Sequence, residues 1–61
     1  MQKFTNAEKA QEANREIAMR QHVYARMAMG KPISDKDQRR IDIMKEIAED
    51  YRLLAEKERL L

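Results

Sequence analysis

A short turn at the midpoint of this 61-residue chain, residues 30–34 with the sequence GKPIS, separates two helical patterns of nearly equal length. Gly30 is suited to the position just past a helix end, because glycine adopts a left-handed backbone without a Cβ penalty. Pro32 cannot continue a helix and pushes the residue before it out of the helical region. Ser34 offers a side-chain oxygen to the free N–H groups of a new helix, with Asp37 placed as the acidic partner of a capping box. The sequence therefore predicts an all-α fold, a two-helix antiparallel hairpin.

The limits of the elements follow from the cap signals and the apolar spacing. Thr5 and Glu8 have the spacing of a capping box, so we expect the first helix to start directly after Thr5. The expected ranges are a first helix at 6–28, a turn at 29–34 and a second helix at 35–60, in a single domain over 1–61.

Apolar residues recur at helical spacing on one face of each pattern. The residues predicted to form the core, within one hairpin or between two, are Ile17, Tyr24, Met27, Ile41, Met44, Ile47, Ala48, Tyr51 and Leu54. In the second helix, Ile43 and Leu61 widen the apolar arc to about 160°. An arc of that width exceeds the seam that one neighbouring helix covers.

The width of this arc predicts a second subunit. A chain of 61 residues with one helix–helix seam buries few side chains, and chains this small usually need a disulfide, a metal or a partner subunit. The sequence has no cysteine, which excludes a disulfide, and it has no metal-ligand spacing. We therefore expect a homodimer in which two hairpins form a four-helix bundle.

Two tyrosines, Tyr24 and Tyr51, lie on the predicted core faces, and we expect them at similar distances from the turn. A buried tyrosine hydroxyl needs a hydrogen-bond partner. The predicted partners are Arg20, which interrupts the apolar stripe of the first helix, or a carboxylate such as Glu16 or Glu58.

Several classes of function have no support in the sequence. The net charge of +2 is too small to indicate nucleic acid on its own. The chain lacks a Glu-x-x-His pair, a glycine-rich phosphate loop, zinc spacing and a serine nucleophile with a partner. We therefore expect no catalytic residue, no metal, no cofactor and no enzymatic activity. No apolar run reaches the length of a membrane span and the N-terminus has no apolar signal stretch, so we expect a cytoplasmic protein without a membrane partner.

Protein recognition is the function that the remaining residues favour. Apolar side chains that fall outside the two apolar faces are candidates for docking another protein. They are Met19, Met29, Leu53 and Leu60. The alternative is a nucleic-acid-binding helical bundle of the ROP type, in which Arg15, His22 and Arg26 share one outer face of the first helix.

Two segments carry a resemblance, EANREIAMRQHVY at residues 12–24 and RRIDIMKEIAEDY at 39–51, with Gly30 between them. Together they resemble a family of small phage and prophage proteins, and more narrowly the short accessory proteins encoded between the exonuclease and excisionase genes of lambdoid phages. The recurring pattern of this family is an Arg-rich helix ending in Val-Tyr, then a glycine turn, then Ile-x-x-Met-x-x-Ile-x-x-Asp-Tyr. Family members often carry a proline directly after Val-Tyr. This chain has Ala25 there, so we expect its first helix to continue unbroken.

The resemblance implies an early-expressed, non-enzymatic phage protein that acts in the cytoplasm of the bacterial host cell. Proteins of that genomic region are associated with host takeover and with the choice between lytic and lysogenic development. The implied partner, besides a second copy of the chain, is a host or phage protein. The family supplies no catalytic residues, and its shared positions, such as Tyr24, Met44 and Tyr51, fall mainly on the predicted core faces.

Overall fold

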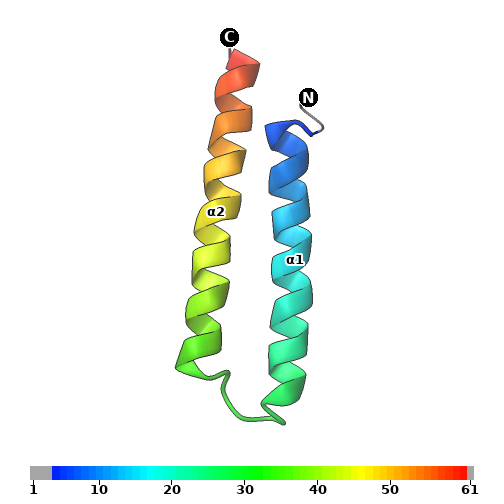
Figure 1. Cartoon of the computed structure of the whole chain (residues 1–61), viewed down its shortest axis with the longest axis vertical. Coiled ribbons are helices and arrows are strands. Elements are labelled where there is room, and N and C mark those ends of the chain that lie inside the picture. The colour runs from blue at the N-terminus through cyan, green and yellow to red at the C-terminus, as the bar shows by residue number, and fades with distance from the viewer. Residues whose placement is uncertain (1–3, 61) are drawn as a thin grey trace.

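Two helices run antiparallel and side by side in the computed structural model, which describes residues 4–60. Helix α1 spans Asn6–Met27 and helix α2 spans Asp35–Leu60. The connection closes one end of the hairpin, here called the turn end. At the other end, the open end, α2 extends beyond the start of α1 (Figure 1). The hairpin measures 46 × 18 × 16 Å, and the predicted helical hairpin is confirmed.

Side-chain caps set the start of both helices. The Glu8 amide donates to Thr5 Oγ1 at 3.1 Å, and the Thr5 amide donates to Glu8 Oε1 at 2.8 Å, so the predicted capping box of α1 is confirmed. The hydrogen bond from the Thr5 backbone also lowers the pKa of the Glu8 carboxyl. At the start of α2, Ser34 Oγ accepts from the Asp37 amide at 3.3 Å.

The turn differs in one detail from the sequence prediction. Helix α1 ends at Met27, one residue before the expected end at Ala28. Gly30 has the left-handed backbone expected of it, with φ of 86°, but Met29 is also left-handed, with φ of 53°. A residue with a Cβ atom pays roughly 1–2 kcal/mol for that conformation. The turn therefore holds one strained residue where glycine would be relaxed.

The seam between the helices is narrow. Its buried side chains are Ala10, Ile17, Tyr24, Ile41 and Ala48, with Ala13, Ile33 and Met44 packed against them. Ile41 is the most deeply buried, with an exposed fraction of 0%. Among the predicted core residues, Ile17, Tyr24, Ile41 and Ala48 are thus buried within one hairpin, while Met44 and Tyr51 are half-buried.

Three predicted core residues are not buried in the hairpin: Met27, Ile47 and Leu54 have exposed fractions of 69%, 47% and 46%. The reason is the width of the apolar arcs. At about 100° per residue, Met27 lies roughly 80° around α1 from Ile17, while Ile47 and Leu54 lie about 120° and 140° around α2 from Ile41. One neighbouring helix covers a narrower arc than these angles span. Ile43, at the edge of the arc, is half exposed, and Leu61 lies outside the described residues.

Candidate interaction surfaces

One candidate surface of the hairpin is made by five apolar side chains from both helices, all at least 46% exposed. This apolar face consists of Val23 and Met27 of α1 and Ile43, Ile47 and Leu54 of α2. On a helical wheel, all five lie about 80–160° around their helix from the centre of the seam, in the same rotational sense. In an antiparallel pair of helices, the same rotational sense corresponds to the same side of the pair.

Contacts between the helices confirm that these two sides face the same way. Within α1, Arg20 donates from Nη1 to the Tyr24 hydroxyl at 3.5 Å. The pKa of Tyr24 is lowered by a hydrogen bond from Arg20 and, to a lesser extent, by one from Arg40 of α2. Near the open end, Lys9 Nζ of α1 lies 5.5 Å from the centre of the Tyr51 ring of α2. All of these groups except Tyr24 lie on the same side of the seam as the apolar face.

The predicted hydroxyl partner of Tyr24 is therefore confirmed as Arg20, whose guanidinium also pairs with Glu16 at 3.0 Å. The predicted equal distance of the two tyrosines from the turn is wrong. Tyr24 lies near the turn end, whereas Tyr51 lies near the open end, opposite Lys9. The reason is the number of residues between each tyrosine and the turn, which is much larger for Tyr51 along α2 than for Tyr24 along α1.

The opposite side of the hairpin carries ion pairs within α2. Arg52 donates from Nη2 to Glu49 at 2.6 Å and from Nη1 to Glu56 at 3.0 Å. The pKa of the Glu49 carboxyl is lowered by its hydrogen bonds from Arg52, and the pKa of Arg52 is raised in turn. Gln38 donates to Asp42 on the same helix at 3.0 Å. Polar pairs of α2 therefore cover part of this side.

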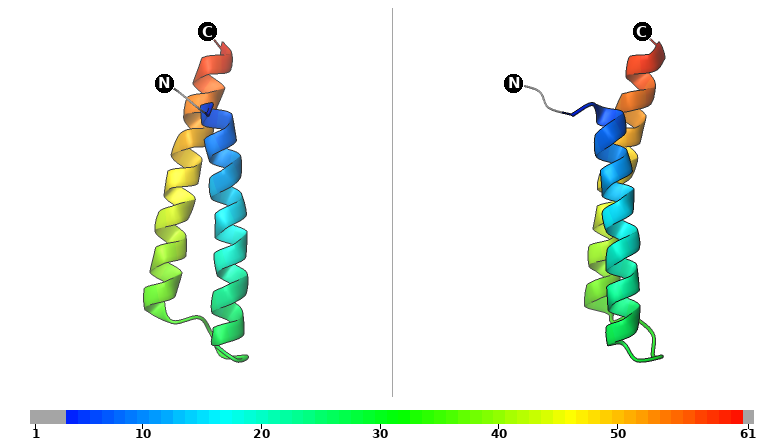
Figure 2. Two further views of the ribbon diagram at one scale, coloured as in Figure 1. Left: turned by 45° about the vertical axis from the view of Figure 1, so that its right-hand side comes forward. Right: turned by 90° about the vertical axis from the view of Figure 1, so that its right-hand side faces the viewer.

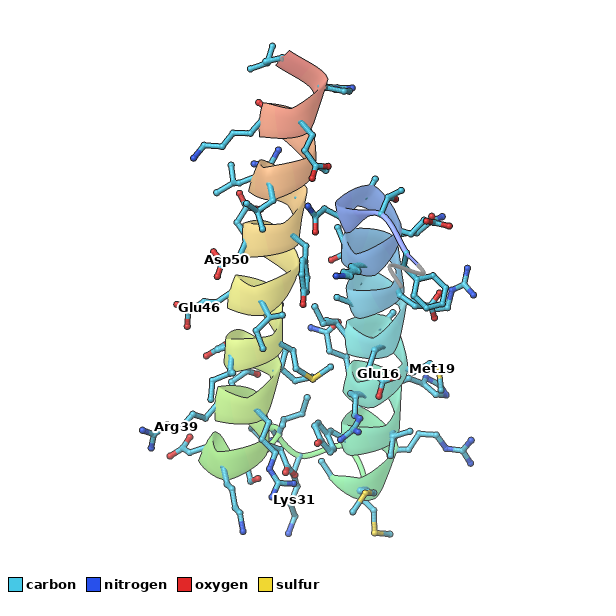
Figure 3. The ribbon with its side chains drawn as sticks, turned by 45° about the horizontal axis from the view of Figure 1, so that its top comes forward. Glu16, Met19, Lys31, Arg39, Glu46 and Asp50 are labelled. Carbon is cyan, nitrogen blue, oxygen red and sulfur yellow. The ribbon has the colours of Figure 1, made fainter. Side chains whose placement is uncertain are left out.

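The four predicted docking residues are all exposed, but the structure does not bring them together. Met19 points from α1 away from α2, as Figure 3 shows, and Met29 lies in the turn. Leu53 and Leu60 share a shallow depression on α2 near the open end, which Asp50, Leu54 and Lys57 also line. This open-end patch, formed by Leu53, Leu54 and Leu60, is the part of the docking prediction that forms a continuous surface.

The three candidate nucleic-acid residues, Arg15, His22 and Arg26, are exposed on the side of α1 that faces away from α2. Two carboxylates share that side. Glu12 pairs with Arg15 at 3.8 Å, and Glu8 lies one turn before it in the capping box. The basic surface is therefore partly neutralised.

Within residues 4–60, no three histidine or carboxylate side chains lie close enough together to hold a metal ion. Arg39, Glu46 and Asp50 point from α2 away from α1 (Figure 3). Neither of the described helices is long and apolar enough to cross a membrane. Chemically, the arrangement offers surfaces for recognition.

In comparisons with known proteins, the chain matches no protein-family model, no curated protein and no solved structure.

Proposed function

We propose that this chain is a non-enzymatic protein-interaction module that acts as a homodimer. The apolar face supports this proposal most directly, because five large side chains on one side of the hairpin stay at least 46% exposed. Burying a side chain of this size contributes roughly 1.5–3 kcal/mol in full, so covering the remaining half of each is a substantial gain. A second hairpin packed on this face gives a four-helix bundle.

The surface left for a partner protein is then Leu53 and Leu60 of the open-end patch, because Leu54 also belongs to the apolar face. Leu53 and Leu60 lie on the side of α2 away from the apolar face, so dimerisation leaves them accessible. Asp50 and Lys57 border the depression and give it a polar rim, as in ordinary protein interfaces. Following the resemblance of residues 12–51, we place this module in the cytoplasm of a bacterium, as an early phage protein that binds a host or phage protein during host takeover or in the lytic–lysogenic choice.

A capture experiment with a matched control tests the partner surface. The tagged chain is expressed in bacteria, and a co-purifying protein is then purified and titrated against wild type, Leu53→Glu/Leu60→Glu and Gln11→Glu. Gln11 is exposed on α1, so Gln11→Glu adds a charge without touching the patch. We expect the double variant to lose at least ten-fold in affinity while it stays a dimer, and Gln11→Glu to bind like wild type. Equal binding by all three proteins contradicts the proposed surface.

A nucleic-acid-binding bundle is the second candidate, supported by the exposure of Arg15, His22 and Arg26 on one side of α1. Binding of this kind rests on phosphate contacts and falls steeply with salt. Its test is the electrophoretic mobility of structured RNA and duplex DNA at low salt. A shift that disappears in Arg15→Ala/Arg26→Ala supports this candidate, and unchanged mobility at low salt excludes it.

A further inference from the structure

We propose that the second copy packs on the apolar face in the antiparallel orientation, so that the two turns lie at opposite ends of the four-helix bundle. This inference rests on the homodimer of the proposed function and adds the orientation of its subunits. Two arrangements with two-fold symmetry are possible for hairpins stacked face to face. In the antiparallel one, α2 packs on α2 of the partner; in the parallel one, α2 packs on α1 of the partner.

The distribution of charge along the hairpin favours the antiparallel arrangement. The half nearer the turn, residues 15–45, contains eight Lys and Arg and four Asp and Glu, a net charge of +4. The rest of the chain contains five Lys and Arg and seven Asp and Glu, a net charge of −2. These two values add up to the net charge of +2 for the chain. The hairpin is therefore an electrical dipole with a basic turn end.

Packing distances make this dipole relevant. Neighbouring helices in a bundle lie about 8–10 Å apart, which is close to the screening length of about 8–10 Å at moderate ionic strength. A parallel dimer sets one basic half directly against the other. An antiparallel dimer sets each basic half against an acidic half, so it gains attraction where the parallel dimer has repulsion.

The position of Ile47 supports the same orientation. Ile47 lies at the middle of α2, which runs from Asp35 to Leu60. When α2 packs antiparallel on its copy, a two-fold axis at the helix centre brings the two Ile47 side chains together. In the parallel dimer, Ile47 instead meets α1 at the level of Glu16, which pairs with Arg20 at 3.0 Å, so an apolar side chain faces an ion pair and not its own copy.

The dimensions of the hairpin allow an interface of standard size. The broad face of the hairpin measures 46 × 18 Å. Its projected area is close to the roughly 800 Å² that each partner contributes to a standard protein interface. Figure 2 shows the elongated shape of the hairpin.

Distances between spin labels test the orientation directly. The sequence contains no cysteine, so Lys31→Cys places a single label at the turn end and Lys57→Cys a single label near the open end. Both side chains are exposed. In the antiparallel dimer, two Lys31→Cys labels are separated by about 40 Å, the length of α2. In a 1:1 mixture of the two variants, dimers that carry one label of each kind show a distance of roughly 20 Å or less.

Sedimentation equilibrium on the same labelled samples separates the possible failures. A dimer supports the inference if its two Lys31→Cys labels are far apart and its Lys31→Cys and Lys57→Cys labels, in the mixed sample, are close together. A dimer in which the two turn labels lie within about 20 Å overturns the orientation and leaves the homodimer of the proposed function intact. A helical monomer overturns both.

Discussion

The seam between the helices and the apolar face beside it use side chains of different size. The buried seam contains two alanines, Ala10 and Ala48, among its five residues, and only Ile41 is completely enclosed. The apolar face contains five side chains of the size of valine or larger, all at least 46% exposed. Small residues let two helices approach closely but contribute little burial. The hairpin thus keeps much of its apolar surface on the side that its own fold leaves uncovered.

This contrast separates two roles of the apolar residues. The seam sets the shape of the hairpin, because Ile17, Tyr24 and Ile41 fix how α1 lies on α2. The apolar face supplies further burial only when another molecule covers it. Substitutions in the seam are therefore expected to act within each chain, and substitutions on the apolar face through association.

The largest effect is expected from Ile41→Ala in the seam. Ile41 is 0% exposed, and truncating a fully buried isoleucine costs about 2–5 kcal/mol because of the lost burial and the cavity left behind. Urea denaturation followed by circular dichroism measures this loss. A cost below about 1 kcal/mol would show that the seam is not the structural centre of the hairpin.

A matched pair of variants tests the apolar face. Ile47 and Leu53 are both 47% exposed in the hairpin, but only Ile47 lies on the apolar face. We expect Ile47→Ala to weaken self-association by about 1–2 kcal/mol per copy, and Leu53→Ala to change it by less than about 0.5 kcal/mol. The measurement is the dimer dissociation constant from sedimentation equilibrium. Equal effects of the two substitutions on the dimer dissociation constant would contradict the distinction between the apolar face and the open-end patch.

Substitutions in the turn serve as a reference for the comparison of the seam with the apolar face, because the turn residues belong to neither. Gly30 has a φ of 86° with nothing within 4 Å of an added Cβ atom, so Gly30→Ala costs backbone strain alone, about 1 kcal/mol. Met29→Gly is expected to raise stability by a similar or smaller amount, since glycine relieves the strain at φ of 53°. The free energy of unfolding is measured at two protein concentrations. A shift that depends on concentration contradicts a purely local effect.

The smallest effect is expected from pH. The folded-state pKa of Glu8 and that of Glu49 are lowered from an ordinary value of 4.5 by hydrogen bonds from Thr5 and Arg52. Their stabilising contribution is therefore fully present above pH 4.5 and is lost as the pH falls through the lowered pKa values. Melting temperatures between neutral pH and about pH 3 should decrease, and should decrease less in Glu8→Gln/Glu49→Gln. An unchanged slope in this double variant contradicts the assignment.

Local signals made the helices predictable. Thr5 and Glu8 define the start of α1 through a capping box, and Ser34 defines the start of α2 through a single hydrogen bond. Gly30 marks the left-handed turn. The left-handed backbone of Met29 was not predictable, because no property of methionine favours it. The geometry of the whole connection imposes that conformation.

The surfaces were only partly predictable. A helical wheel places Met27, Ile47 and Leu54 on the apolar side of their helices, but it does not show which part of a wide arc the other helix covers. The docking prediction had the same weakness, because exposure of Met19, Met29, Leu53 and Leu60 did not imply that they lie together. Only the structure shows that Leu53 and Leu60 share one depression.

Sedimentation equilibrium across a wide concentration range, with helicity measured by circular dichroism in the same samples, tests the central claim most directly. We predict a helical dimer of twice the 7.3 kDa chain mass that dissociates, with loss of helix, on dilution or in Ile47→Glu. A fully helical monomer at every concentration would contradict the claim that the apolar face is covered by a second copy.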